Sequence, residues 1–131
     1  MSRHERFLAR AASVAEASPH PRWSLGCIVV RGSSVIACAP NVQRNSPNVL
    51  EGGPGTSWHA EVNALRKLTY QADRAEGAVL YVVRISRTGK RRLARPCQRC
   101  FKAITAAGIK TIVYSLDDEP SFGLEKVYST V

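Results

Sequence analysis

The segment from Leu25 to Asn41, LGCIVVRGSSVIACAPN, constrains the fold more than any other part of the sequence. It contains two apolar runs joined by the short turn RGSS, a pattern typical of a β-hairpin. Both runs are too apolar to have a wet face, so we expect them to enter a sheet that is covered on both sides. If Arg31 pairs with Ser34, Cys27 lies opposite Cys38, which predicts two small buried thiols.

The remaining segments supply the other layers of such a sheet. Apolar spacing and helix-ending signals predict helices over residues 3–17, about 59–70 and 97–108, with strands over 78–86 and 109–115. Residues 40–58 are rich in proline and glycine and predict a long loop. In the tail we expect a short helical turn and a last strand over 126–130. This order predicts an α/β fold, a three-layer α/β/α sandwich around a mixed sheet of about four or five strands.

The length and composition predict one globular domain spanning residues 1–131, in which 44% of the residues are hydrophobic and 22% are charged. No signal-peptide pattern and no apolar window of membrane-spanning length is present, so we expect a soluble, cytoplasmic protein without a membrane partner. A net charge of +9 predicts attraction to anions such as nucleotides or nucleic acid. The four cysteines should be reduced in the cytosol, which favours metal binding or burial over disulfides.

Cys97 and Cys100 stand three positions apart in the basic stretch RRLARPCQRCFKA. The pair alone fits half a zinc finger, a redox site or the metal end of a hydrolytic enzyme. At the first turn of a helix both thiols can face one point, and His59 begins the other helix that follows a loop. One histidine and two cysteines would leave the fourth zinc position open, as in catalytic sites, and Glu61 would be placed to move protons.

The motif HAEVNAL, followed by RPCQRCFKAITAAGIKTIVYS, resembles the zinc-dependent cytidine and deoxycytidylate deaminase superfamily, with its H-x-E and P-C-x-x-C signature. Asn63 and the AGIK segment look most like the deoxycytidylate deaminase branch and its phage-encoded members. The resemblance implies a cytidine deaminase-like fold, zinc on His59, Cys97 and Cys100, and hydrolysis of cytosine to uracil with Glu61 as acid and base.

By the same resemblance, Asn41 would contact the sugar or base and the Ala60 backbone would contact the base carbonyl. The substrate would be a free pyrimidine nucleotide or nucleoside such as dCMP, and the protein would be a homo-oligomer, at least a dimer. The connector before Pro96 is longer and more basic than is usual in the family, and it predicts that Arg92 or Arg95 binds the substrate phosphate.

Two alternatives remain open at this stage. The same chemistry could act on a base in single-stranded DNA or RNA, which the positive charge favours. Alternatively, the chain could be a non-catalytic, zinc-stabilised nucleic-acid-binding module. That module requires a closed metal site, and Cys27 and Cys38 are the only remaining thiols that could close it.

Overall fold

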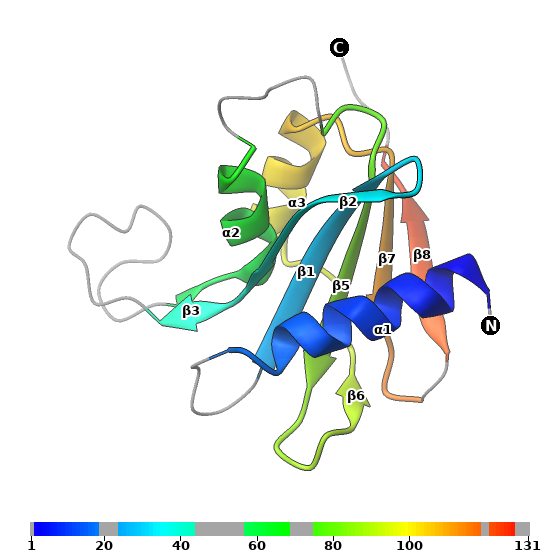
Figure 1. Cartoon of the computed structure of the whole chain (residues 1–131). Helices are drawn as coiled ribbons and strands as arrows, with labels where there is room; N and C mark the ends of the chain where they lie inside the picture. The colour runs from blue at the N-terminus through cyan, green and yellow to red at the C-terminus, as the bar shows by residue number, and fades with distance from the viewer. Residues whose placement is uncertain (1, 19–23, 44–56, 69–74, 119–120, 128–131) are drawn as a thin grey trace.

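The computed structural model describes residues 2–18, 24–43, 57–68, 75–118 and 121–127 and has three layers (Figure 1). The helices are α1 (Arg3–Ala15), α2 (Ala60–Arg66) and α3 (Gln98–Ala106). The longer strands are β1 (Ser24–Arg31), β2 (Ser34–Pro40), β5 (Val79–Ile85), β7 (Thr111–Ser115) and β8 (Phe122–Lys126). Three two-residue strands are β3 (Val42–Gln43), β4 (Ser57–Trp58) and β6 (Arg91–Arg92).

The main sheet has the order β2-β1-β5-β7-β8, and β6 pairs with β5 as a sixth strand. Strand β5 is parallel to β7, whereas the other pairs in this sheet are antiparallel. The mixed sheet is therefore as predicted, with the short β6 added to the expected four or five strands. Strands β3 and β4 form a separate two-stranded ladder. Residues 44–56, which make up most of the loop predicted over 40–58, lie outside the described residues.

The two faces of the sheet carry separate apolar clusters because successive side chains of a strand point to opposite sides. Leu80 and Val82 of β5 pack in the cluster that α2 and α3 cover. Tyr81 and Val83 of the same strand pack in the cluster that contains Phe7, Leu8 and Ala11 of α1. The three-layer prediction is confirmed, and α1 lies on the face opposite α2 and α3 (Figure 1).

The prediction of two buried, facing thiols in the hairpin is wrong. Arg31 does pair with Ser34, but the register shifts between Val29 and Val30, so Cys27 lies opposite Ala39. The partners of Val29 and Val30 are two residues apart on β2, which leaves one extra residue on that strand, as in a β-bulge. Cys27 is buried, whereas Cys38 is exposed, because β2 is an edge strand with a partly solvent-facing surface.

The boundaries of several helices and strands also differ from the prediction. Helix α1 ends at Ala15, two residues early, and α2 is shorter than predicted, with residues 69–74 outside the described part. The last strand is Phe122–Lys126, ahead of the predicted 126–130, of which 128–130 lie outside the described residues. Residues 116–118 contain no helical turn, and 119–120 are not described. No helix of the described segments is long and apolar enough to cross a membrane.

Candidate active site

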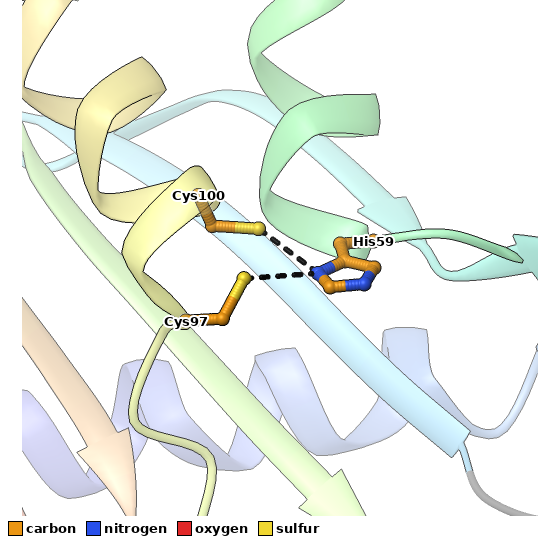
Figure 2. A group of neighbouring side chains, drawn as sticks. All are labelled: His59, Cys97 and Cys100. Atoms are coloured by element: carbon orange, nitrogen blue, oxygen red, sulfur yellow. Dashed lines mark hydrogen bonds between the residues drawn. The ribbon is translucent and has the colours of Figure 1, made fainter. Parts of the chain in front are cut away.

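Three side chains that could hold a metal ion converge between the starts of α2 and α3 (Figure 2). The ligand atoms of His59, Cys97 and Cys100 all lie within 4.8 Å of one another. The His59 Nδ1 atom is 3.0 Å from the Cys100 Sγ atom and 3.6 Å from the Cys97 Sγ atom. The same ring nitrogen therefore faces both sulfur atoms.

Helix capping explains why these side chains meet. His59 is the N-cap of α2 and Cys97 is the N-cap of α3, both in extended backbone conformation, and neither side chain bonds to its own helix. Cys100 follows Cys97 by three residues and returns to the same side of α3. The two helices pack together on one face of the sheet, which brings the imidazole and both thiols to one point.

The donor set fits zinc. One imidazole nitrogen and two cysteine sulfurs are ligands that zinc commonly takes, and both cysteines are free of disulfides. Burial raises the pKa of the Cys100 thiol, with further increases from the nearby Glu61 and Cys97. A bound cation would reverse this effect, because a coordinating thiol loses its proton. Within the described segments, no fourth His, Cys, Asp or Glu side chain joins the group.

Glu61 lies in the first turn of α2 and is buried, with only 3% of its surface exposed. Its Oε1 atom has no hydrogen-bond partner in the part of the chain that the structure describes. Burial raises the pKa of this carboxyl to about 7, although hydrogen bonds to its own backbone and to Cys100 oppose the shift. A carboxyl with a pKa near neutrality can both accept and donate a proton at physiological pH.

A cavity of about 280 Å³ opens beside Glu61 and the candidate metal ligands. Five residues singled out from the sequence line it: Asn41, His59, Glu61, Arg95 and Cys97. Ala60 is buried between His59 and Glu61, and Arg92 is exposed on β6; neither is among the residues that line the cavity. Whether Asn41, Ala60, Arg92 and Arg95 bind substrate stays a prediction.

Asn41 is held in the cavity wall by specific hydrogen bonds. It is 2% exposed, and its Oδ1 atom accepts from the Leu25 backbone N–H at 2.9 Å and from the Ser18 hydroxyl at 2.5 Å. A buried amide with a fixed orientation is suited to selecting one arrangement of donors and acceptors in a ligand.

The sequence analysis missed four residues of the cavity wall, which are Leu25, Arg84, Leu93 and Ala94. Arg84 belongs to β5 and pairs with Arg92 of β6, so the β5–β6 hairpin brings it to the wall. Strand pairing depends on the tertiary structure, so no local sequence motif indicated that Arg84 lies at the cavity. The one available signal was that a charged residue stands near the end of an otherwise apolar strand.

The basic connector before Cys97 is fastened to the end of β7. The Ser115 side chain is buried, accepts from the Arg84 backbone N–H at 3.1 Å and donates to the Arg92 carbonyl at 2.6 Å. The Ser115 carbonyl also accepts from the Ala94 N–H, and the Asp117 carboxylate accepts from the Leu93 N–H. These bonds hold the connector as a wall of the cavity.

The chain belongs to the family described as "Cytidine and deoxycytidylate deaminase zinc-binding region", whose family model matches residues 1–116. The fold and the His, Cys, Cys and Glu arrangement agree with this class of protein, as the resemblance of the two motifs implied.

Individual known proteins are also similar to this chain. ComE operon protein 2 of Bacillus subtilis (strain 168) is 28% identical over an alignment of 125 residues that covers 89% of this chain and 61% of that protein. The chain thus spans about three fifths of the length of this curated relative. The crystal structure of dCMP deaminase from the cyanophage S-TIM5 in complex with dCMP and dUMP has a TM-score of 0.66 and 27% identity, covering 87% of this chain and 82% of that one.

The fold itself is also shared with a more distant enzyme. Cytidine deaminase from Burkholderia pseudomallei aligns with a TM-score of 0.68 over 97% of this chain and 94% of that one, at 19% identity.

Proposed function

We propose that this protein is a zinc-dependent deaminase that hydrolyses the cytosine base of a free nucleotide or nucleoside, with dCMP as the favoured substrate. The observation that carries the proposal is Glu61: a buried carboxyl with an oxygen that lacks a partner in the described segments, in the wall of the cavity that His59 and Cys97 also line. A buried polar atom without a partner is costly, and such atoms are concentrated where chemistry needs them.

The residues of the site have separate roles in this reaction. His59, Cys97 and Cys100 would hold the zinc ion. When bound, zinc supplies Lewis-acid activation of a water molecule near neutral pH. The connector that Ser115 fastens through the Arg92 carbonyl contributes Leu93, Ala94 and Arg95 to the cavity wall.

Glu61 would move the protons. Its carboxylate takes a proton from the attacking water and delivers it to N3 of the cytosine ring, and a second transfer then protonates the departing amine. The C4–N bond breaks, ammonia leaves, and the C4 carbonyl of uracil forms from the water oxygen. A pKa of about 7 suits a group that must accept and return a proton in one turnover.

A free nucleotide is favoured over other substrates by two observations. The S-TIM5 enzyme, which is similar over most of this chain, was crystallised in complex with dCMP and dUMP. The cavity contains two arginines, Arg84 and Arg95, that could meet an anionic substituent on a small ligand. Deamination of free nucleotides also fits the cytoplasmic location that the sequence predicts.

Single-stranded nucleic acid remains the second candidate because of the net charge of +9 and the exposed basic residues around the connector, namely Lys90, Arg92, Arg99 and Lys102. The non-catalytic zinc module is disfavoured, since in the described segments the metal group has three side chains rather than four. Cys27 is buried in β1 and Cys38 is exposed on β2, and neither belongs to the group.

The test is turnover of a substrate panel by zinc-loaded protein. Ammonia release is measured with cytidine, deoxycytidine, dCMP, dCTP and a cytosine-containing single strand, with Glu61→Gln as the inactive control. We expect dCMP to have the highest kcat/KM. Preference for the single strand would transfer the proposal to polynucleotides, and release from none of the five would refute it.

A further inference from the structure

A carboxylate from the last strand reaches the rim of the cavity. The Arg95 Nε atom donates to the Glu125 Oε1 atom at 2.5 Å, and Arg95 Nη2 donates to Oε2 at 3.2 Å. Arg95 lines the cavity and precedes Cys97 by two residues, whereas Glu125 lies on β8, beyond residue 116, where the family match ends. The contact therefore joins the active site to a strand that the family match does not include.

Glu125 is itself fixed by β7. Tyr114 pairs with Gly123 across the β7–β8 ladder, and its hydroxyl donates to Glu125 Oε1 at 3.1 Å. A Cβ atom at Gly123 would stand 2.3 Å from two carbons of the Tyr114 ring, so only glycine lets the ring lie across β8. Glu125 follows Gly123 by two residues and projects from the same face of the strand. Tyr114 thus holds the carboxylate towards Arg95.

The geometry leaves Arg95 partly available to a ligand. A guanidinium has five N–H donors in a planar fork, and Glu125 accepts from the edge that contains Nε and Nη2. The edge that contains Nη1 is not used by Glu125. The Arg95 and Glu125 side chains are 54% and 28% exposed. An ion pair that is this exposed to solvent contributes little to stability. Its effect is instead to restrict the orientation of a long, flexible side chain at the rim.

We propose that Glu125 is a positioning residue that orients Arg95, so that the remaining donors of the guanidinium bind the phosphate of a nucleotide substrate. The inference rests on the proposed function and narrows its substrate to a phosphorylated one. Arg95 touches the substrate; Glu125 and Tyr114 act through Arg95.

Two opposing effects decide the sign of a Glu125 substitution. Removing the carboxylate frees positive charge on Arg95, which would strengthen phosphate binding. It also releases the guanidinium from its fixed plane, which weakens a bidentate contact with phosphate. Arg95 is more than half exposed, so water screens the charge effect strongly, and the loss of orientation dominates.

The experiment compares KM and kcat for dCMP and deoxycytidine in Glu125→Ala, Glu125→Gln and Arg95→Ala proteins. Arg95→Ala should raise the KM for dCMP about 10-fold to 100-fold, as expected for one charge-assisted contact. Glu125→Ala should raise it about 10-fold and Glu125→Gln less, because glutamine still accepts one hydrogen bond. The kcat values and the KM for deoxycytidine should change by less than about twofold.

Asp118→Asn is the matched control, since Asp118 is an exposed carboxylate shortly after β7 and is not among the described residues that interact with Arg95. It should leave both KM values unchanged. In the Arg95→Ala background, Glu125→Ala should add no further effect on dCMP, because a positioning residue without its target has no role. Additive effects, equal effects on both substrates, or tighter dCMP binding after removal of the carboxylate would each overturn the proposal.

Equilibrium binding of dCMP and deoxycytidine to zinc-loaded protein separates this inference from the proposed function. If wild-type protein releases no ammonia but Glu125→Ala selectively weakens dCMP binding, the function is wrong and the inference stands. If wild-type protein turns over both substrates and the variants show no selectivity for phosphate, only the inference fails. Binding of neither ligand would reject both.

Discussion

Glu61 combines burial with a carboxylate oxygen that lacks a partner in the described segments, and this combination destabilises a fold. A buried polar group without a hydrogen bond costs about 1–3 kcal/mol. An ordinary first-turn acid would lie on the surface and stabilise the helix dipole from there. The position of Glu61 is therefore better explained by chemistry than by helix stability.

Replacing Glu61 with glutamine should separate these two roles. The variant keeps the shape of the side chain and removes its basic oxygen, so kcat should fall by about 10²-fold to 10⁴-fold. Bound zinc and the melting temperature should not decrease, because no stabilising bond to Oε1 is lost. Turnover by ammonia release, zinc by elemental analysis and unfolding by circular dichroism measure the three outcomes; near-normal turnover would remove Glu61 from the mechanism.

Substitution of single cysteines tests which of them hold the zinc ion. Purified protein should contain one zinc per chain, and Cys97→Ser or Cys100→Ser should lose most of it, since each removes one of three ligands. Cys38→Ser is the control: this thiol is exposed on β2 and does not belong to the group, so zinc content should be unchanged. Zinc-free wild-type protein, or equal loss in the control, would contradict the assignment.

The spacing of the two motifs and the family that they resemble predicted that His59, Glu61, Cys97 and Cys100 form one site, and the structure brings the ligand atoms of the histidine and the two cysteines together. Each motif starts a helix, and the geometry of a helix start is local. Arg84 and Glu125 could not be found in this way, because their positions depend on strand pairing. A slip of one residue in a sheet sends a side chain to the opposite face, and the sequence does not fix the register of a short strand.

At the scale of elements, Gly26 determines how closely α1 approaches the sheet. A Cβ atom there would lie 2.1 Å from the Ala11 carbonyl oxygen and 2.4 Å from the Ala15 backbone nitrogen. The backbone of α1 therefore packs directly on β1, and small residues such as Ala11 and Ala15, both fully buried, line that contact.

Gly26→Ala should destabilise the fold by about 1–3 kcal/mol, because helix backbone rather than a flexible side chain must move to accommodate the methyl group. Denaturant unfolding measures the loss. Ser13→Ala, on the exposed side of α1, is the control and should change the free energy of unfolding by less than about 0.5 kcal/mol. Equal stability of the two variants would show that α1 shifts without cost.

The long elements were predictable and the short ones were not. Helix α1 has strong apolar periodicity, and β1, β5 and β7 are continuous apolar runs, so these elements were expected close to where they lie. Strand β8 contains Gly123 and two charged residues in five positions, so its sequence lacks a strand pattern, and pairing with β7 creates the strand. The bulge on β2 could not be predicted either, because a bulge depends on how the hairpin packs in the folded protein.

At the scale of the whole molecule, two exposed leucines near the site are consistent with the predicted assembly of the protein into oligomers. Leu93 is 49% exposed in the cavity wall and Leu124 is 44% exposed on β8, next to the Glu125 contact. We predict at least a dimer, in which a neighbouring copy completes these edges. Light scattering at micromolar concentration measures the mass; a monomeric mass would contradict the prediction.

The net charge of +9 permits either a free nucleotide or a polynucleotide as substrate, and salt dependence distinguishes them. Each phosphate contact with a single strand lowers the affinity with a slope of about −0.7 in log–log form. Raising the salt concentration about fourfold should therefore raise the KM for dCMP, with its one phosphate, by about threefold at most.

A strand held through about six phosphates would lose about 10²-fold to 10³-fold in affinity over the same change. We expect the shallow dependence, measured as KM against salt concentration for dCMP, with deoxycytidine as the uncharged control that should show almost none. A steep loss of activity on a cytosine-containing strand, together with a higher kcat/KM on that strand than on dCMP at low salt, would show that the basic surface tracks a polynucleotide backbone. The cavity at the metal group would then receive a base displaced from that strand.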